Sequence, residues 1–153
     1  MVKPIPEGFH TLTPSMSLER CGEAIEFFKK AFGARELHRA PDPSGKKIWH
    51  ADLMIGNSHL FVNDLFPEMG QKTNVTASLW LYTDHVDAQY KRAVDAGCTV
   101  RMALADMFWG DRSGTVADPW GNSWSLTQHV KDMTHEEMMK AGEEMAKAAA
   151  KHK

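Results

Sequence analysis

The sequence predicts an α+β fold that consists of two βαβββ modules followed by a C-terminal helix. The first observation behind this prediction is an internal repeat, because residues 51–60 and 117–126 share an Ala-Asp start, a Gly-Asn-Ser centre and a final leucine. The second is that residues 24–33 and 86–97, which precede the two copies, both have helical periodicity and end in glycine, a common helix stop. A unit that is used only twice favours a pseudo-symmetric fold whose halves enclose a space.

The first module is expected at about residues 9–64. Residues 9–17 alternate apolar and hydroxyl side chains, which predicts a strand with Pro14 at an edge or a bulge. Apolar residues then recur at three-and-four spacing over residues 24–32, as is typical of an amphipathic helix that covers a sheet. Three further strands are predicted between turn residues, at residues 35–40, 47–55 and 58–63.

The second module is expected at about residues 75–130, after a linker at residues 65–74 that contains proline and glycine. It repeats the order of the first module, with a helix that begins at Val86. Its predicted strands lie at residues 77–83, 99–103, 114–117 and 123–129. An unusually aromatic and charged loop, residues 106–113, separates two of these strands.

A C-terminal helix is predicted over about residues 134–150. Thr134 and Glu137 have the spacing of a capping box, and good helix formers follow them. We expect this helix and both modules to form a single domain over residues 1–153.

Composition and charge exclude several classes of partner. A chain of 153 residues with 42% hydrophobic and 25% charged residues is typical of a globular domain. Its net charge of −2, without a run of basic residues interleaved with aromatic ones, argues against nucleic acid as a partner. We expect no membrane association and a cytoplasmic location, because residues 1–8 lack a signal-peptide core and no apolar run has membrane-spanning length. Cys21 and Cys98 are predicted to be structural cysteines.

Specific motifs accompany the repeated order of elements. They are Phe27-Phe28 in the first helix, Phe-Trp-Gly-Asp-Arg at residues 108–112, and Asp-Pro-Trp-Gly-Asn-Ser-Trp at residues 118–124. With them the chain resembles the vicinal oxygen chelate superfamily of glyoxalases, bleomycin resistance proteins and dioxygenases, and in particular its PhnB-like branch. The resemblance implies that each module forms a half-barrel and that two halves form a cup for a small-molecule ligand. It also implies a homodimer, because a second subunit commonly completes such a cup.

Metal-dependent members of that superfamily hold a divalent ion with His, Gln and Glu side chains from equivalent strands. The resemblance places those positions at Thr13, Phe61, Ser78 and Ser125 of this chain. None of these side chains is a strong ligand, which favours a cup without a metal cofactor. The alternative is a divalent-metal site rebuilt from side chains of the first module, namely His10, His50, Asp52, His59 and Asp64.

The loop at residues 106–113 provides the first candidate ligand-binding residues. Phe108 and Trp109 offer ring surface, and Asp111 and Arg112 offer charges that can bind a carboxylate or a phosphate. We expect Trp109 to line a pocket, because aromatic and charged loops on rigid sheets are frequent recognition sites. An internal salt bridge between Asp111 and Arg112 is the alternative for that pair.

Strand parity adds further candidates. Ser78 and Trp80 share one face of their strand, and Ser125 occupies the former ligand position of the last strand, so we expect all three to border the cup.

In the first module, His50 is expected to face the cup as a base or hydrogen-bonding group, with a structural histidine as the alternative. By parity we expect His59 to point the other way. Asp64 is expected at the rim of the cup, where it could meet a polar ligand or Lys47, the alternative being a solvated carboxylate that caps the next turn. The remaining histidines, His129 among them, are assigned no role.

The sequence therefore favours a protein that binds or sequesters a compact small molecule without the usual metal. The alternative is a metal-dependent lyase, isomerase or dioxygenase with a nonstandard ligand set. A regulatory or interaction module is a third interpretation, based on the methionines of the C-terminal helix. No catalytic residue can be assigned from the sequence.

Overall fold

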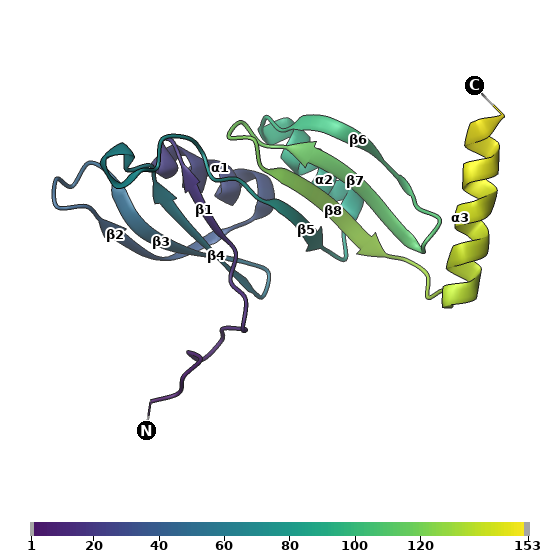
Figure 1. The fold of residues 1–153 in the computed structure, drawn as a ribbon, viewed down its shortest axis with the longest axis horizontal. Helices are drawn as coiled ribbons and strands as arrows, with labels where there is room; N and C mark the ends of the chain where they lie inside the picture. Colours follow the sequence, from purple (N-terminus) through teal and green to yellow (C-terminus); the bar gives the residue numbers. More distant parts are fainter. Residues whose placement is uncertain (1, 152–153) are drawn as a thin grey trace.

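The computed structural model describes residues 2–151 and contains two four-stranded sheets, each with a helix packed on one face (Figure 1). The first module comprises β1 (Ser15–Leu18), α1 (Cys21–Phe32), β2 (Arg35–Pro41), β3 (Ile48–Ile55) and β4 (Ser58–Asp64). The second module comprises β5 (Ser78–Tyr82), α2 (Val86–Ala96), β6 (Thr99–Asp106), β7 (Asp111–Ala117) and β8 (Ser123–His129). A 3-10 turn, η1 (Pro67–Met69), lies between the modules, and α3 (His135–Ala150) follows them.

Both sheets have the same topology, which confirms the two βαβββ modules. The strand orders are β1-β4-β3-β2 and β5-β8-β7-β6, with the first pair parallel and the other pairs antiparallel in each case. Parallel neighbours need a crossover connection, and α1 and α2 belong to these crossovers. Each sheet therefore has one face covered by its helix and one face free of helices.

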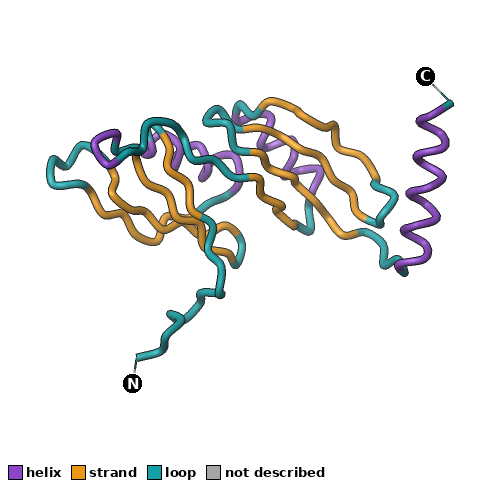
Figure 2. Tube along the Cα trace, in the orientation of Figure 1, coloured by secondary structure: helices purple, strands orange, loops and turns teal. Residues whose placement is uncertain are grey.

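The first strand is shorter than expected. It begins at Ser15 instead of residue 9, and Figure 2 draws the stretch before it as a loop that leaves the sheet. Pro14 has no N–H for a strand ladder, although its carbonyl still accepts a hydrogen bond from the Phe61 N–H at 3.0 Å. Proline thus ends the regular pairing on this side.

The aromatic loop is also shorter than expected. β6 continues to Asp106 and β7 already starts at Asp111, so only residues 107–110 form the turn. Gly110 has a φ of 97°, and the Met107 N–H donates to the Asp111 carbonyl at 2.7 Å, which closes the hairpin. As a consequence, Asp111 and Arg112 are strand residues that point to opposite faces.

One core spans both modules. Phe28 is fully buried and packs against Trp120 and Trp124, so side chains of α1 and of the second module share a cluster. Polar contacts add to this junction, because side chains of α2 bind the last carbonyls of α1. Arg92 donates to the carbonyls of Lys30 and Lys29 at 2.6 and 2.9 Å, and Gln89 donates to that of Ala31 at 2.7 Å.

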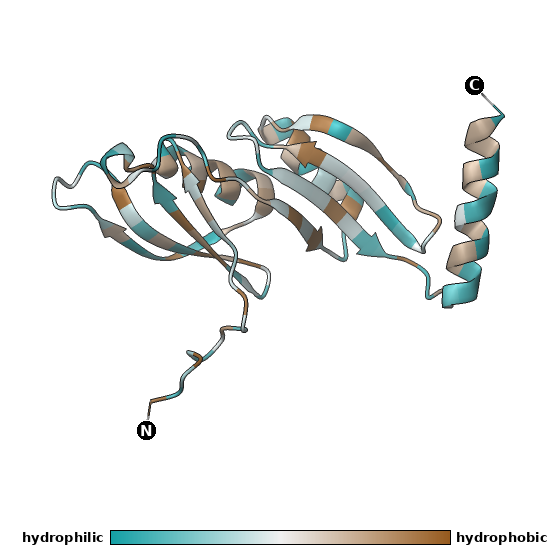
Figure 3. Cartoon of the chain, viewed as in Figure 1, coloured by the Kyte–Doolittle hydropathy of each residue, from teal (hydrophilic) through white to brown (hydrophobic). Residues whose placement is uncertain are grey.

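The C-terminal helix α3 begins with the predicted capping box, in which Thr134 and Glu137 each bond the other's backbone N–H. No residue of α3 is buried, and hydrophilic and more hydrophobic residues alternate along its visible side (Figure 3). Gly142 lies against the Phe108 ring, since a Cβ there would come within 3.2 Å of that ring. None of the described helices has the length and hydropathy needed to cross a membrane.

The two cysteines are free and buried. Burial raises the pKa of the Cys21 thiol and that of the Cys98 thiol to about 12. A thiol with such a pKa stays protonated near neutral pH and is not a nucleophile, which agrees with the prediction that both cysteines are structural.

Candidate ligand-binding site

Four small hydroxyl side chains form a row on the helix-free face of the second sheet. The Ser113 and Thr127 hydroxyls lie 2.7 Å apart, and the Thr115 and Ser125 hydroxyls lie 3.1 Å apart, across the β7–β8 pair. We call this row, Ser113, Thr115, Ser125 and Thr127, the hydroxyl floor. Ser113 and Thr127 are fully buried, whereas Thr115 is half-buried and Ser125 is 7% exposed. Because a hydroxyl can both donate and accept, the Thr115–Ser125 pair is the one that keeps hydrogen-bonding capacity for a ligand.

Aromatic side chains stand beside the hydroxyl floor. Trp80 and Tyr82 of β5 are adjacent to Ser125 and Thr127 in the sheet, and they remain 53% and 62% exposed. The centroid of the Trp109 ring lies 6.4 Å from that of Trp80. We call Trp80, Tyr82 and Trp109 the aromatic wall. Exposed rings next to buried hydroxyls are an arrangement that can hold a planar molecule with polar substituents.

Phe108 supports this wall from behind. Its ring meets the Trp109 ring edge to face at a centroid distance of 5.0 Å, and it also lies against Gly142 of α3. The structure thus places Phe108 behind Trp109, between the wall and the C-terminal helix.

Asp111 holds the wall in position. Its buried carboxylate accepts hydrogen bonds from Trp109 Nε1 at 2.9 Å, from His129 Nδ1 at 2.8 Å and from the Tyr82 hydroxyl at 3.4 Å. Burial, followed by the Asp111 charge, raises the pKa of Tyr82. Because both oxygens of Asp111 already have partners, this residue positions the rings instead of offering a free charge to a ligand.

His129 is a residue of this cluster that the sequence did not indicate. Its Nε2 bonds to Asp132 at 2.9 Å while its Nδ1 bonds to Asp111, and the carboxylates of Asp111 and then Asp132 raise the pKa of His129. The signal that could have identified it is parity, since it follows Ser125 and Thr127 at intervals of two and lies opposite Asp111 in register.

Arg112 lies outside the site. Its guanidinium bonds to Asp87 at 2.8 and 3.0 Å and to Asp106 at 3.2 Å, on the side of the sheet that carries α2. These carboxylates raise the pKa of Arg112 above its usual range. The alternative salt bridge with Asp111 is therefore wrong, because neighbouring strand residues point to opposite faces. The same alternation places Arg112 on the face opposite the hydroxyl floor.

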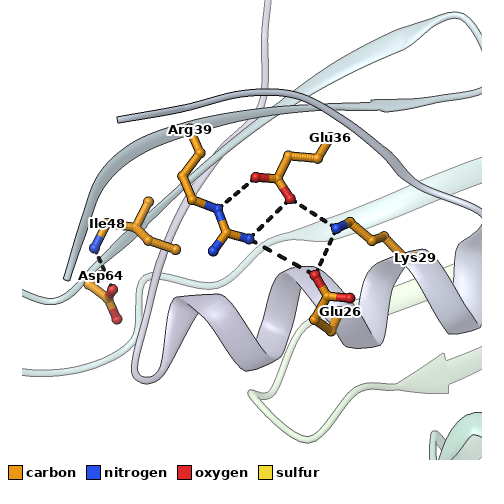
Figure 4. Close-up of polar contacts among 6 residues, drawn as sticks. All are labelled: Glu26, Lys29, Glu36, Arg39, Ile48 and Asp64. Atoms are coloured by element: carbon orange, nitrogen blue, oxygen red, sulfur yellow. Dashed lines mark hydrogen bonds and ion pairs between the residues drawn. The ribbon is translucent and has the colours of Figure 1, made fainter. Parts of the chain in front are cut away.

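Asp64 is buried within the first module and does not lie at the rim of a cup. Its side chain is buried and accepts hydrogen bonds from the Cys21 N–H at 2.9 Å and from the Ile48 N–H at 2.8 Å, of which Figure 4 shows the second. The first of these bonds satisfies a free N–H at the start of α1. Gln128 has the equivalent contact in the second module, with the Val86 N–H at the start of α2, at 3.2 Å.

A network of ion pairs lies beside Asp64 and joins α1 to β2. Lys29 bonds to both Glu26 and Glu36 at 2.7 and 2.9 Å, and Arg39 bonds to Glu36 at 2.6 Å (Figure 4). All four charges have partners within the module, so this surface does not present an unpaired charge to a ligand.

Ser78 and His50 occupy different places. Ser78 is exposed at the start of β5, on the same face as Trp80 and next to Ser123. His50 lies on the helix-free face of the first sheet, where its ring meets Phe61 edge to face at 4.7 Å. The predicted site residues are thus divided between the two sheets, with Ser78, Trp80, Trp109, Asp111 and Ser125 together on the second.

His59 shares its face with His50, contrary to the expected opposite orientation. Met54 pairs with His59 and Asp52 pairs with Phe61 in the β3–β4 register, so all four lie on the helix-free face. Counting parity through the Gly56-Asn57 turn gives the wrong side, because paired strands restart their alternation at the turn.

The superfamily's metal positions do not fit a metal in this chain. Phe61 projects from the helix-free face of the first sheet with a ring that has no donor atom, and the Ser125 hydroxyl is buried against Thr115. Over residues 2–151, no three His, Cys, Asp or Glu side chains converge in a way that could hold a metal ion.

A separate groove of about 500 Å³ lies where the modules meet. Its walls include Phe32, Leu60, Leu79 and Leu81, together with His59. It also reaches Trp80 and Tyr82, so the groove and the aromatic wall meet at β5. We call it the junction groove.

The chain is similar to known proteins over most of its length. A family model described as the Glyoxalase/Bleomycin resistance protein/Dioxygenase superfamily matches residues 15–126. The uncharacterized protein Mb0911c of Mycobacterium bovis is 43% identical over 138 residues, which cover 85% of this chain and 90% of that protein.

Solved structures have the same fold. TioX from Micromonospora sp. ML1 matches with a TM-score of 0.61 and 26% identity over 78% of this chain and 99% of its own. TnmS3, an antibiotic binding protein from Streptomyces sp. CB03234, matches with a TM-score of 0.57 and 25% identity over 79% of this chain and 96% of its own.

Proposed function

Because this chain belongs to the glyoxalase/bleomycin resistance protein/dioxygenase superfamily, we propose that it binds a planar aromatic small molecule on the helix-free face of its second sheet. The proposed ligand carries hydroxyl or carbonyl groups. It is bound or sequestered without a metal cofactor, and the protein acts in the cytoplasm as a member of the PhnB-like branch.

The observation that carries this proposal is the aromatic wall beside the hydroxyl floor. The rings of Trp80 and Trp109 have centroids 6.4 Å apart and are tilted by 53° to each other, and Ser125 lies next to Trp80 in the sheet. Stacking on the rings would supply affinity, and hydrogen bonds to the floor would select for polar substituents. The likeness to TnmS3, an antibiotic binding protein, supports this ligand class.

The same proposal includes a homodimer. In one chain the helix-free faces of the two sheets lie side by side and do not oppose each other (Figure 1). A ligand on the second sheet would therefore remain open to water on one side unless another copy covers it. We propose that the first sheet of a second copy, with His50 and Phe61 on its face, supplies the opposite wall.

The expected metal ligands of the metal-dependent alternative are occupied by other contacts. Asp64, one of its expected ligands, is already bonded to two backbone N–H groups, and the Asp52 carboxylate is bonded to His59. We therefore do not favour it.

Quercetin and flavone test the proposed function as a matched pair of ligands. The two share one planar skeleton, but only quercetin carries hydroxyl groups. Isothermal titration calorimetry of the full chain should show tighter binding of quercetin. Trp109→Ala should weaken quercetin binding by about thirtyfold or more, since a central aromatic anchor is commonly worth about 2 kcal/mol or above.

Arg112→Gln provides the control, because this side chain lies on the opposite face of β7 and should leave both affinities unchanged. Failure of the wild-type chain to bind either compound, or an unchanged quercetin affinity in a folded Trp109→Ala variant, would contradict the proposed site. Sedimentation equilibrium on the same samples measures the dimer, and a monomer that binds quercetin would refute only the role of the second copy.

A further inference from the structure

His59 and Asp52 form a hydrogen-bonded pair beside the junction groove. His59 Nδ1 lies 2.8 and 3.0 Å from the two carboxylate oxygens of Asp52. The two side chains are only 9% and 14% exposed. A carboxylate at Nδ1 fixes the proton of a neutral imidazole there and leaves the lone pair on Nε2.

The other ring nitrogen of His59 has no hydrogen-bond partner in the described part of the chain. Among residues 2–151, no fully buried side-chain nitrogen or oxygen lacks a partner, so the unpartnered Nε2 is accessible from outside. Gly8 lies beside it, because a Cβ on Gly8 would be 3.7 Å from Nε2. His59 is also one of the residues that line the junction groove.

Packing holds the ring of His59 in this orientation. Phe9 stacks on it with a centroid distance of 3.7 Å and an interplanar angle of 16°. Asp52 fixes the ring edge at the same time. The imidazole thus has Nδ1 on a carboxylate, a stacked face and no protein partner at Nε2, and it belongs to a residue that lines a cavity. A ring held in this way is arranged as a proton acceptor.

The rest of the junction groove is mainly apolar. Phe32, Leu60, Leu79 and Leu81 contribute to its walls, and its volume of about 500 Å³ suits a small organic molecule. Polar side chains, His10 and Gln89 among them, also line the groove, but His59 is the one held by a carboxylate. A mainly apolar groove with such a histidine favours a ligand that is mostly hydrocarbon and carries one acidic hydroxyl.

We propose that the junction groove is a second small-molecule site, which binds a compact phenol whose hydroxyl proton passes to His59 Nε2. In this step the phenol O–H bond breaks and an N–H bond forms at Nε2. The products are a bound phenolate and an imidazolium, and the Asp52 carboxylate balances the imidazolium charge. The groove shares Trp80 and Tyr82 with the aromatic wall, but His59 and Asp52 belong to the first module, so the proton transfer does not depend on the ligand proposed for the hydroxyl floor.

4-Nitrophenol is the probe that tests this inference, because its phenolate absorbs visible light and its phenol does not. The full chain is titrated into the probe at a fixed pH near the probe's own ionisation midpoint. Binding to the wild-type chain should increase the phenolate fraction. 4-Nitroanisole, which has the same ring but no acidic proton, should bind more weakly and give no phenolate signal.

Substitutions test whether the phenolate signal arises from His59 and Asp52. His59→Gln should abolish the phenolate increase. Asp52→Asn should reduce the equilibrium constant for proton transfer to residue 59 by about tenfold, as expected when a charged hydrogen bond is lost. His85→Gln is the control, since His85 is exposed before α2 and is not among the residues that line the groove, and it should behave as the wild type. His10→Gln tests the other histidine of the groove and should retain the signal.

Ser58→Trp keeps the inference testable if the pair cannot be changed without unfolding. Ser58 is an exposed residue at the edge of the groove, so a tryptophan there should block 4-nitrophenol while the pair stays intact. Circular dichroism and thermal unfolding verify that each variant is folded. An unchanged phenolate signal in folded His59→Gln or Ser58→Trp, or no phenolate increase in the wild type, would overturn the proposal, whatever the result with quercetin.

Discussion

Phe32 and Trp124 stack face to face across the boundary between the two modules, with ring centroids 4.0 Å apart and an interplanar angle of 22°. Phe32 is the last residue of α1, and Trp124 belongs to β8. They are 4% and 1% exposed, so the stack is part of the core. The two modules are therefore joined by close packing and not only by the chain that connects them.

Phe32→Ala should lower the free energy of unfolding by about 3–5 kcal/mol, because it removes a buried ring and leaves a cavity in the shared core. Equilibrium unfolding in urea measures this change. Leu37→Ala, at a position that is 47% exposed, is the control and should cost no more than about 0.5 kcal/mol. Similar losses in both variants would mean that the stack does not stabilise the junction.

Asp64→Ala should destabilise the fold by about 1–3 kcal/mol, because it leaves the N–H groups of Cys21 and Ile48 without their acceptor in a buried setting. Asp64→Asn keeps one acceptor oxygen and should be less harmful. Quercetin affinity should be unchanged in both folded variants, and a loss of affinity without a loss of stability would restore Asp64 to the ligand site.

Ser125→Ala should weaken quercetin binding by about two- to tenfold and leave flavone binding unchanged, since a neutral hydrogen bond contributes about 0.5–1.5 kcal/mol. The affinities of both compounds are measured by calorimetry. Equal weakening of the two would show that the variant disturbs the shape of the face and not a hydrogen bond to the ligand.

His129 should make the segment that leads to α3 sensitive to pH. Because Asp111 and Asp132 raise its pKa above 6.5, the ion pairs are fully present below that value and are lost as the pH rises through the raised folded pKa. Hydrogen exchange of residues 130–134, corrected for intrinsic rates, should therefore accelerate over that pH range. His129→Gln should exchange at the faster rate throughout, and a wild-type rate that does not change with pH would contradict the role of His129.

The order of elements could be predicted from the sequence because each element has its own local signal. The apolar spacing and the glycines at residues 33 and 97 define α1 and α2, and both glycines have positive φ angles at the helix ends. Thr134 and Glu137 likewise define the start of α3.

The orientation of single side chains was harder to predict. Treating residues 106–113 as a loop hid the fact that Asp111 and Arg112 alternate in a strand, and counting through the Gly56-Asn57 turn placed His59 on the wrong face. Such errors arise because register depends on where pairing starts, which residue composition does not specify.

Long-range partners could not be predicted at all. The acceptor role of Asp64 depends on Cys21, which is 43 residues away, and the contact of His129 with Asp111 depends on the β7–β8 register. Tertiary packing determines these partners, so the hydrogen bonds of Asp64 and His129 could not be predicted from the sequence.

The contacts between α2 and the end of α1 affect the order in which the protein can be completed during synthesis. Arg92 reaches the Lys30 carbonyl across a separation of 62 residues, and Gln89 reaches Ala31 from the same helix. When the first module leaves the ribosome, the last turn of α1 therefore still lacks these partners. The amino-terminal half of this duplicated chain is finished only after the second helix has been translated, although the two halves look alike.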